Sequence, residues 1–147
     1  MKLVPVKLEI EENKEFLNNP DCHDTIFMTM DFYHRAGFDP PWIGYYALID
    51  NQIVGSGAFK GKPVNGMVEI AYGTIEKFRG QGIGTAICEG LVKMALQNDS
   101  SVKITARTLR EESGSTHILL KNNFILNGTI TDPDDGEVWE WIYCGKR

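Results

Sequence analysis

The most informative part of this chain is Val68-Glu69-Ile70-Ala71-Tyr72-Gly73-Thr74-Ile75-Glu76-Lys77-Phe78-Arg79-Gly80-Gln81-Gly82-Ile83-Gly84-Thr85-Ala86. An apolar segment typical of a β-strand leads into a turn with three glycines, and an amphipathic helix follows. Glycines at 80, 82 and 84 let the backbone approach a ligand closely. The helix start offers unpaired N–H groups and the positive end of its dipole. The stretch therefore predicts an anion site that suits a pyrophosphate.

Two common phosphate-binding loops do not match this spacing. A dinucleotide loop, G-x-G-x-x-G, beginning at Gly80 requires glycine where the chain has Thr85. A P-loop beginning at the same residue requires Gly-Lys where the chain has Thr85-Ala86. A nucleotide-binding module also needs a lysine or an acidic ribose ligand at fixed spacing, and neither is in place.

The glycine turn resembles the acyl-CoA loop of the GNAT superfamily of N-acetyltransferases, which has the pattern Arg/Gln-x-x-Gly-x-Gly/Ala. Arg79, Gly82 and Gly84 match that pattern in full. The preceding residues 69–72 look like the strand that carries the catalytic glutamate in histone-type members of the superfamily. Strand, loop and helix together make the resemblance more specific than the glycines alone.

The order of the remaining patterns agrees with that resemblance over nearly the whole chain. The patterns predict a strand at 2–5, a helix within 6–18, a helix at 24–36, strands at 45–49, 53–59 and 68–75, a helix at 82–97, a strand at 102–106, a helix at 113–122, and strands at 124–131 and 138–143. Asp24 is the expected N-cap of the second helix, and Asp39-Pro40-Pro41 forces a turn after it.

The resemblance implies a single-domain α/β fold over residues 1–147. The expected architecture is a mixed, mostly antiparallel, twisted sheet of about seven strands flanked by about four helices. In the family, the strand before the glycine loop splays away from the next strand, and the pantetheine arm of CoA pairs with the backbone exposed there. A backbone N–H near Gly73 or Thr74 would then donate to the thioester carbonyl as negative charge develops on it.

The resemblance also implies which residues form the CoA site. The expected acetyl-CoA contacts are Gly73, Thr74, Ile75, Arg79, Gly80, Gln81, Gly82, Ile83, Gly84, Thr85 and Ser115. Ser115 belongs to the second family signature, Asn-x-x-Ser followed by Lys-x-Gly-Phe, here Glu112-Ser113-Gly114-Ser115 and Lys121-Asn122-Asn123-Phe124. A serine that only begins the helix is the alternative for Ser115. Asn123 replaces the family glycine, and asparagine is the next best residue for a left-handed helix end.

Acetyl transfer to an amine requires removal of a proton, because a lysine-like amine has a pKa of about 10.4. Glu69 is the expected base, directly or through a water, and a solvated strand glutamate is the alternative. Family members often place a tyrosine at the position of Leu119 to protonate the leaving thiolate. Tyr143 is the expected substitute, with Tyr72 and His117 as alternatives, although a thiolate can leave unaided.

Composition narrows the function classes further. The chain has 147 residues, a net charge of −5 and three cysteines with no C-x-x-C pair. Acidic charge argues against nucleic-acid or anionic-membrane binding, and no zinc site or disulfide framework is suggested. Neither a signal peptide nor a membrane span is indicated, so a cytoplasmic protein is expected. Cys88, on the apolar side of a predicted helix, is expected to be a buried and unreactive thiol.

The sequence thus predicts an acetyl-CoA-dependent N-acetyltransferase that needs no metal, with direct attack by an amine in a ternary complex. An acyl-CoA-binding sensor or a catalytically silent GNAT fold is the alternative, and a homodimer stays open. The expected acceptor is a small cationic amine or a peptide amine, because aromatic and acidic residues favour a cation. They are Phe32, Tyr33, Trp42, Trp139, Trp141, Asp132, Asp134, Asp135 and Glu69.

Overall fold

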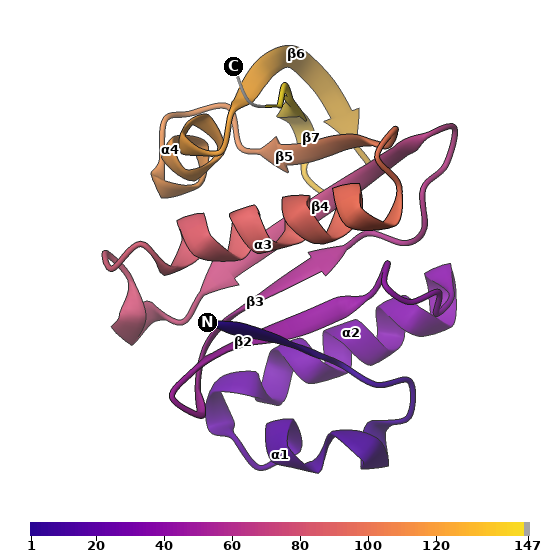
Figure 1. The fold of residues 1–147 in the computed structure, drawn as a ribbon, viewed down its shortest axis with the longest axis vertical. Coiled ribbons are helices and arrows are strands. Elements are labelled where there is room, and N and C mark those ends of the chain that lie inside the picture. The colour runs from indigo at the N-terminus through magenta and orange to yellow at the C-terminus, as the bar shows by residue number, and fades with distance from the viewer. Residues whose placement is uncertain (146–147) are drawn as a thin grey trace.

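The structure is a computed structural model, and it describes residues 1–145 (Figure 1). Its elements in chain order are β1 (Lys2–Pro5), η1 (Ile10–Asn13), α1 (Lys14–Leu17), η2 (Pro20–Cys22), α2 (His23–Ala36), β2 (Gly44–Ile49), β3 (Gln52–Phe59), β4 (Met67–Thr74), η3 (Glu76–Phe78), α3 (Ile83–Asn98), β5 (Lys103–Thr108), α4 (Gly114–Lys121), β6 (Phe124–Asp132) and β7 (Gly136–Tyr143).

The strands form one sheet of seven strands, as predicted, and their order in the sheet is β1-β2-β3-β4-β5-β7-β6. The pairing of β4 with β5 is parallel, and the other five neighbouring pairs are antiparallel. The parallel ladder joins Met67–Ile70 to Lys103–Ala106 and then stops. Along 71–74, β4 keeps its ladder with β3 but has no strand partner on its other side within the described residues. The expected splay is therefore present.

Helices cover the two faces of the sheet, and small residues let them pack closely. On β3, a Cβ at Gly57 would lie 2.7 Å from the Cγ2 atom of Ile87, so α3 packs directly on this strand. On β2, a Cβ at Gly44 would lie 3.2 Å from the Cγ2 atom of Thr29, in α2. Gly44 pairs with Ala58, which alternates with Gly57 along β3. The helices α2 and α3 therefore lie on opposite faces of the sheet.

Figure 1 shows α3 crossing the sheet over β3 and β4, with α4 beside it towards the β5 and β6 end. On α3, Ile87 and Leu91 are fully buried against the sheet, as the apolar stripe predicted. Cys88 is buried as expected, and burial raises the pKa of its thiol to about 12. No helix in the described part of the chain is both long and apolar enough to cross a membrane.

The N-terminal helix expected within 6–18 is much shorter in the structure. Only η1 and α1 are helical there, because the buried side chain of Asn13 binds backbone groups that a helix would pair internally. Its Oδ1 accepts a hydrogen bond from the Lys7 N–H at 2.9 Å, and its Nδ2 donates to the carbonyls of Lys7 and Glu9. The segment before η1 is thereby held out of a helix.

The second predicted helix also begins differently. The expected N-cap, Asp24, lies inside α2, which starts at His23 with Cys22 in the N-cap position. The preceding η2 already brings the chain into helical geometry, and the Asn19 side chain caps it by accepting the Asp21 N–H at 2.9 Å. At the end of α4 the prediction is confirmed, because Asn123 adopts a left-handed conformation with φ of 66°.

Candidate active site

The glycine loop forms because β4 ends where its ladder with β3 ends. The Ile75 N–H donates to the Val54 carbonyl at 2.9 Å, and the short η3 turn then leads the chain to Arg79. Gly80 and Gly82 both have φ of 78°, in the left-handed region that glycine tolerates best. Gly82 occupies the N-cap position of α3. The loop thus delivers the chain into the helix with its backbone unobstructed.

A cleft of about 750 Å³ lies between this loop, the end of β4 and the first turns of α3 and α4. Its lining residues are Tyr72, Gly73, Thr74, Phe78, Arg79, Gly80, Gly82, Ile83, Gly84, Thr85, Ser113, Gly114, Ser115, His117, Ile118 and Lys121. We name it the cofactor cleft. Arg79 and Lys121 contribute positive charge, and within residues 1–145 no acidic side chain lines it. This charge adds to the positive end of the α3 dipole.

Nine of the eleven residues predicted to contact acetyl-CoA line the cofactor cleft. Ile75 and Gln81 do not, although they flank residues that do. Sequence reasoning missed Phe78, Ile118 and the contribution of Lys121. The last two could have been found from helical spacing, because His117 and Lys121 stand four residues apart on α4, with Ile118 next to the first.

The cleft fits a pyrophosphate at the loop, because a Cβ built at Gly80 or Gly82 would have no heavy atom within 4 Å. The backbone there is open, and the first N–H groups of α3 have no partner inside the helix. Gly84 has another role. A Cβ on it would lie 2.5 Å from the Cδ1 atom of Ile118, so Gly84 lets α4 pack closely against α3.

The α4 side of the cleft is held by hydrogen bonds to β4 and α3. Ser113 is the N-cap of α4 and accepts the Thr116 N–H, so Ser115 is not the capping serine. The Tyr72 hydroxyl donates to the Ser115 carbonyl at 3.0 Å, and burial raises the pKa of Tyr72. The Asn122 side chain donates to the Thr85 carbonyl at 3.2 Å. These contacts connect α4 to both other walls of the cleft.

A second cavity, of about 240 Å³, lies on the opposite face of the sheet under α2. It is lined by Val6, Thr25, Thr29, Gly44, Tyr45, Tyr46, Ser56, Gly57, Ala58, Ala71, Tyr72 and Gly73. None of these residues is charged. Tyr72 and Gly73 line both spaces, and they lie on the part of β4 that has lost its β5 partner. The two spaces therefore approach each other at the splay. We name the second one the α2 cavity.

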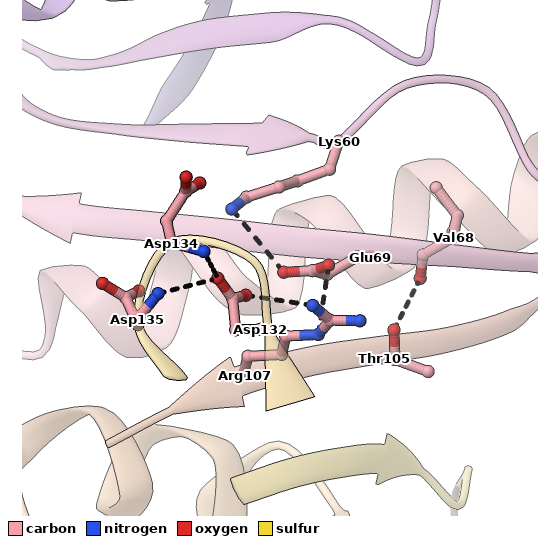
Figure 2. Close-up of polar contacts among 8 residues, drawn as sticks. All are labelled: Lys60, Val68, Glu69, Thr105, Arg107, Asp132, Asp134 and Asp135. Carbon is pink, nitrogen blue, oxygen red and sulfur yellow. Dashed lines mark hydrogen bonds and ion pairs between the residues drawn. The ribbon is translucent and has the colours of Figure 1, made fainter. Parts of the chain in front are cut away.

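Glu69 lies on β4 on the same face as Ala71 and Gly73, but it lines neither space. Its carboxylate, 19% exposed, pairs with two cations: Lys60 Nζ lies 3.7 Å from Oε2, and Arg107 Nε lies 3.5 Å from Oε1 (Figure 2). It is therefore a half-buried, ion-paired residue rather than a solvated strand glutamate. Gly73 is about 13 Å away along the strand, at about 3.3 Å per residue.

Asp132 ends this chain of charges at the β6–β7 turn. Arg107 Nη1 donates to its Oδ2 at 2.9 Å, and the N–H groups of Asp134 and Asp135 donate to its Oδ1 at 2.9 and 3.1 Å (Figure 2). The Asp134 N–H contributes most, followed by Arg107, and together they lower the pKa of Asp132 to about 2. Asp132 therefore stays ionised throughout the physiological pH range.

Tyr143 lines neither the cofactor cleft nor the α2 cavity. Tyr143 lines a separate groove with residues of the C-terminal half of α3, such as Leu96, and its ring packs 5.5 Å from that of Phe124. The reason is the direction of β7. Trp139 and Glu140 pair with β5 at the splay, and β7 then continues along the part of β5 that pairs with β4, so that it ends away from the splay. Of the alternative acids, Tyr72 and His117 line the cofactor cleft. Leu119, at the family tyrosine position, is fully buried.

Of the five aromatic residues expected at the acceptor site, two are buried in the core and the other three are partly buried against it. Tyr33 and Trp141 are 5% and 4% exposed, and Trp42 packs edge-on against Phe59 at 5.1 Å. The Tyr33 hydroxyl donates to the Val6 carbonyl and accepts a hydrogen bond from the Gly44 N–H.

Within residues 1–145, no group of three His, Cys, Asp or Glu side chains could hold a metal ion.

Comparisons with known proteins agree with this geometry. The model of the acetyltransferase (GNAT) family matches residues 8–124. An uncharacterized N-acetyltransferase, YjdG, of Bacillus subtilis strain 168 is 37% identical over 112 residues. That alignment covers 75% of this chain and 62% of YjdG, so this chain spans less than two thirds of the length of YjdG. The chain belongs to the GNAT acetyltransferase family.

Two solved structures show the same fold at low identity. The aminoglycoside acetyltransferase AAC(6')-Ib, in complex with coenzyme A and kanamycin, is 20% identical and superposes with a TM-score of 0.67, covering 96% of this chain and 94% of its own. The ribosomal L7/L12 alpha-N-protein acetyltransferase RimL, in complex with coenzyme A, is 16% identical with a TM-score of 0.63, covering 89% and 76%. At these low identities, the two similarities show a common fold alone.

Proposed function

We propose that this protein transfers an acetyl group from acetyl-CoA directly to a primary amine. The observation that carries the proposal is the meeting of two spaces at Tyr72 and Gly73, where β4 has no β5 partner. One space is open, basic and bounded by a helix N-terminus, which suits a phosphorylated cofactor. The other is small and uncharged, which suits an amine end. Direct transfer requires the two substrates to meet at such a point.

In this proposal the loop from Arg79 to Thr85 holds the pyrophosphate of CoA, with Lys121 adding charge from α4. The backbone of Gly73 to Ile75, unpaired on the splay side, pairs with the amides of pantetheine. Ser115 completes the α4 wall. A backbone N–H near Gly73 or Thr74 donates to the thioester carbonyl, which gains negative charge as the amine attacks.

Glu69 is the proposed proton acceptor for the attacking amine. Its distance from Gly73 along β4 excludes direct contact with an amine at Gly73, so the proton travels through water on the face that carries Glu69 and Ala71. Within the described residues, the α2 cavity offers hydroxyls but no carboxylate. The carboxylate of Glu69, outside the cavity but on the same face, is therefore the group that can accept the proton. We propose no residue for thiolate protonation, because a thiol with a pKa of about 8.5 is a tolerable leaving group.

The proposed acceptor is a cationic amine whose reacting end enters the α2 cavity. The cavity volume of about 240 Å³ is small, so only one end of a large acceptor fits. The rest would extend along the face that carries Glu69 and the acidic β6–β7 turn, where Asp134 and Asp135 are exposed. AAC(6')-Ib has been crystallised with kanamycin, an example of such an acceptor for a protein of this fold. Carboxylates on this face favour a cation.

The experiment is a panel of amines assayed by release of CoA from acetyl-CoA. We expect a polyamine, an amino sugar or a basic peptide to be acetylated with kcat/KM at least about tenfold above that for glutamate, with a preference that weakens in salt because exposed charges are screened. A tenfold preference for glutamate would contradict the acceptor class. Binding of acetyl-CoA without transfer to any amine would contradict the enzymatic proposal and indicate an acyl-CoA sensor.

A further inference from the structure

Arg107 stands at the point where the two halves of the sheet separate. The parallel ladder of β4 and β5 ends with the pair Ile70 and Ala106, so Arg107 is the first β5 residue beyond it. On its other side Arg107 pairs with Glu140 of β7. Its backbone therefore follows the β5 and β7 half, away from the unpaired part of β4.

The Arg107 side chain nevertheless reaches back across the splay. It is 30% exposed, and its guanidinium contacts Glu69 on β4 and Asp132 at the end of β6. Lys60 extends the chain of charges on the far side of Glu69 (Figure 2). A second side-chain link from β5 to β4 is the Thr105 hydroxyl, which donates to the Val68 carbonyl at 3.4 Å within the ladder. From its place just beyond the ladder, Arg107 thus connects β5 to Glu69 of β4, which lies inside the ladder, and to the end of β6.

Two features fix the orientation of the Arg107 guanidinium. A guanidinium is a planar fork that can hold two carboxylates at once, whereas a lysine ammonium is a single point of charge. Asp132 is itself fixed, because its second oxygen accepts the N–H groups of Asp134 and Asp135. Arg107 is therefore oriented from the hairpin side by a rigid anchor. In that orientation its Nε faces Glu69.

We propose that Arg107 is a positioning residue that holds Glu69 towards the splay and fixes the β6–β7 turn over the same face. The inference rests on the proposed function of Glu69 as proton acceptor. Arg107 lines neither the cofactor cleft nor the α2 cavity, so it acts through Glu69 and the turn. It follows that losing Arg107 impairs proton removal while the binding of acetyl-CoA is unaffected.

The test is a double-mutant cycle on Glu69 and Arg107, read as kcat/KM for the best amine of the panel. R107Q is expected to lower kcat/KM by about tenfold or more, because a misplaced proton acceptor costs this much. Adding R107Q to E69Q should cost at most a further factor of about two, because two residues that act as one unit are not additive. R107K, which keeps the charge but loses the fork, should resemble R107Q. The KM for acetyl-CoA should stay within about twofold of the wild type in every variant.

R110Q is the matched control, because Arg110 forms an exposed ion pair with Glu137 of the same hairpin at 3.7 Å. It should leave kcat/KM unchanged. Hydrogen exchange gives a second reading: the amides of Asp134 and Asp135 should exchange faster in R107Q than in the wild type or R110Q, since their acceptor Asp132 loses its partner.

Three results would overturn the inference. The first is a double variant in which the two losses multiply, and the second is R107Q with wild-type kcat/KM. The third is loss of folding in both R107Q and R107K, shown by loss of the cooperative melt, which would make Arg107 purely structural. Failure of the wild-type protein to acetylate any amine would instead reject the proposed function itself, and this inference with it.

Discussion

Glu69→Gln is expected to lower kcat/KM by about 10² to 10⁴ at neutral pH, which is the usual contribution of a positioned general base. The amide keeps the size of the side chain, but it cannot take a proton and it carries no charge to pair with Arg107 or Lys60. The KM for acetyl-CoA should be nearly unchanged, because Glu69 does not line the cofactor cleft. The deficit should shrink as the pH rises towards the pKa of the acceptor amine.

The measurement is a set of initial rates against both substrates from pH 6 to pH 10. Glu89→Gln is the matched control, because Glu89 is exposed on α3 and outside the cofactor cleft and the α2 cavity. It should behave as the wild type. Equal activity of Glu69→Gln and wild type at pH 7 would show that Glu69 serves only the ion-pair network with Lys60 and Arg107.

Gly82→Val is expected to weaken acetyl-CoA binding by about tenfold or more, equivalent to about 1.4 kcal/mol. The space beside Gly82 is empty, so a branched side chain would occupy the place proposed for the pyrophosphate. The substitution also forces a β-branched residue to a φ of 78°, which by itself costs stability. Titration calorimetry with acetyl-CoA measures the first effect, and a thermal melt measures the second.

Gly66→Val separates the two effects. Gly66 has φ of 76° and equally empty surroundings, but it lies in the loop before β4 and does not line the cofactor cleft. It should melt at a lower temperature and bind acetyl-CoA with wild-type affinity. Normal affinity in a folded Gly82→Val protein would place the pyrophosphate elsewhere. Gly84→Val is a poorer probe, because its side chain would first collide with Ile118.

Much of the fold was predictable because local patterns and tertiary packing agree. The alternation in β4, the positive φ at Gly80 and Gly82 and the apolar stripe of α3 all specify the same strand, loop and helix. The N-terminal segment was not predictable in this way, because a single buried side chain, Asn13, replaces helical hydrogen bonds there. Helix propensity does not register such a local side-chain-to-backbone pairing.

The candidate site was likewise predictable only where its residues are close together in the sequence. Most residues predicted around the glycine loop do line the cofactor cleft, since their positions follow from one turn. The partners of Glu69 were not, because Arg107 and Asp132 reach it through strand pairing between distant segments. The assignment of Tyr143 failed for a related reason: neither spacing nor composition shows which end of β7 faces the splay.

Acetyl-CoA is expected to stabilise the folded protein, and thermal unfolding measures this effect. A ligand that binds only the native state stabilises it by about 2.7 kcal/mol when present at 100 times its Kd. The melting temperature should therefore rise with acetyl-CoA concentration, while NADH and ATP, which lack the pantetheine arm, should raise it much less. A melting temperature that is unchanged in millimolar acetyl-CoA would contradict the assignment of the cofactor cleft and the transfer reaction built on it.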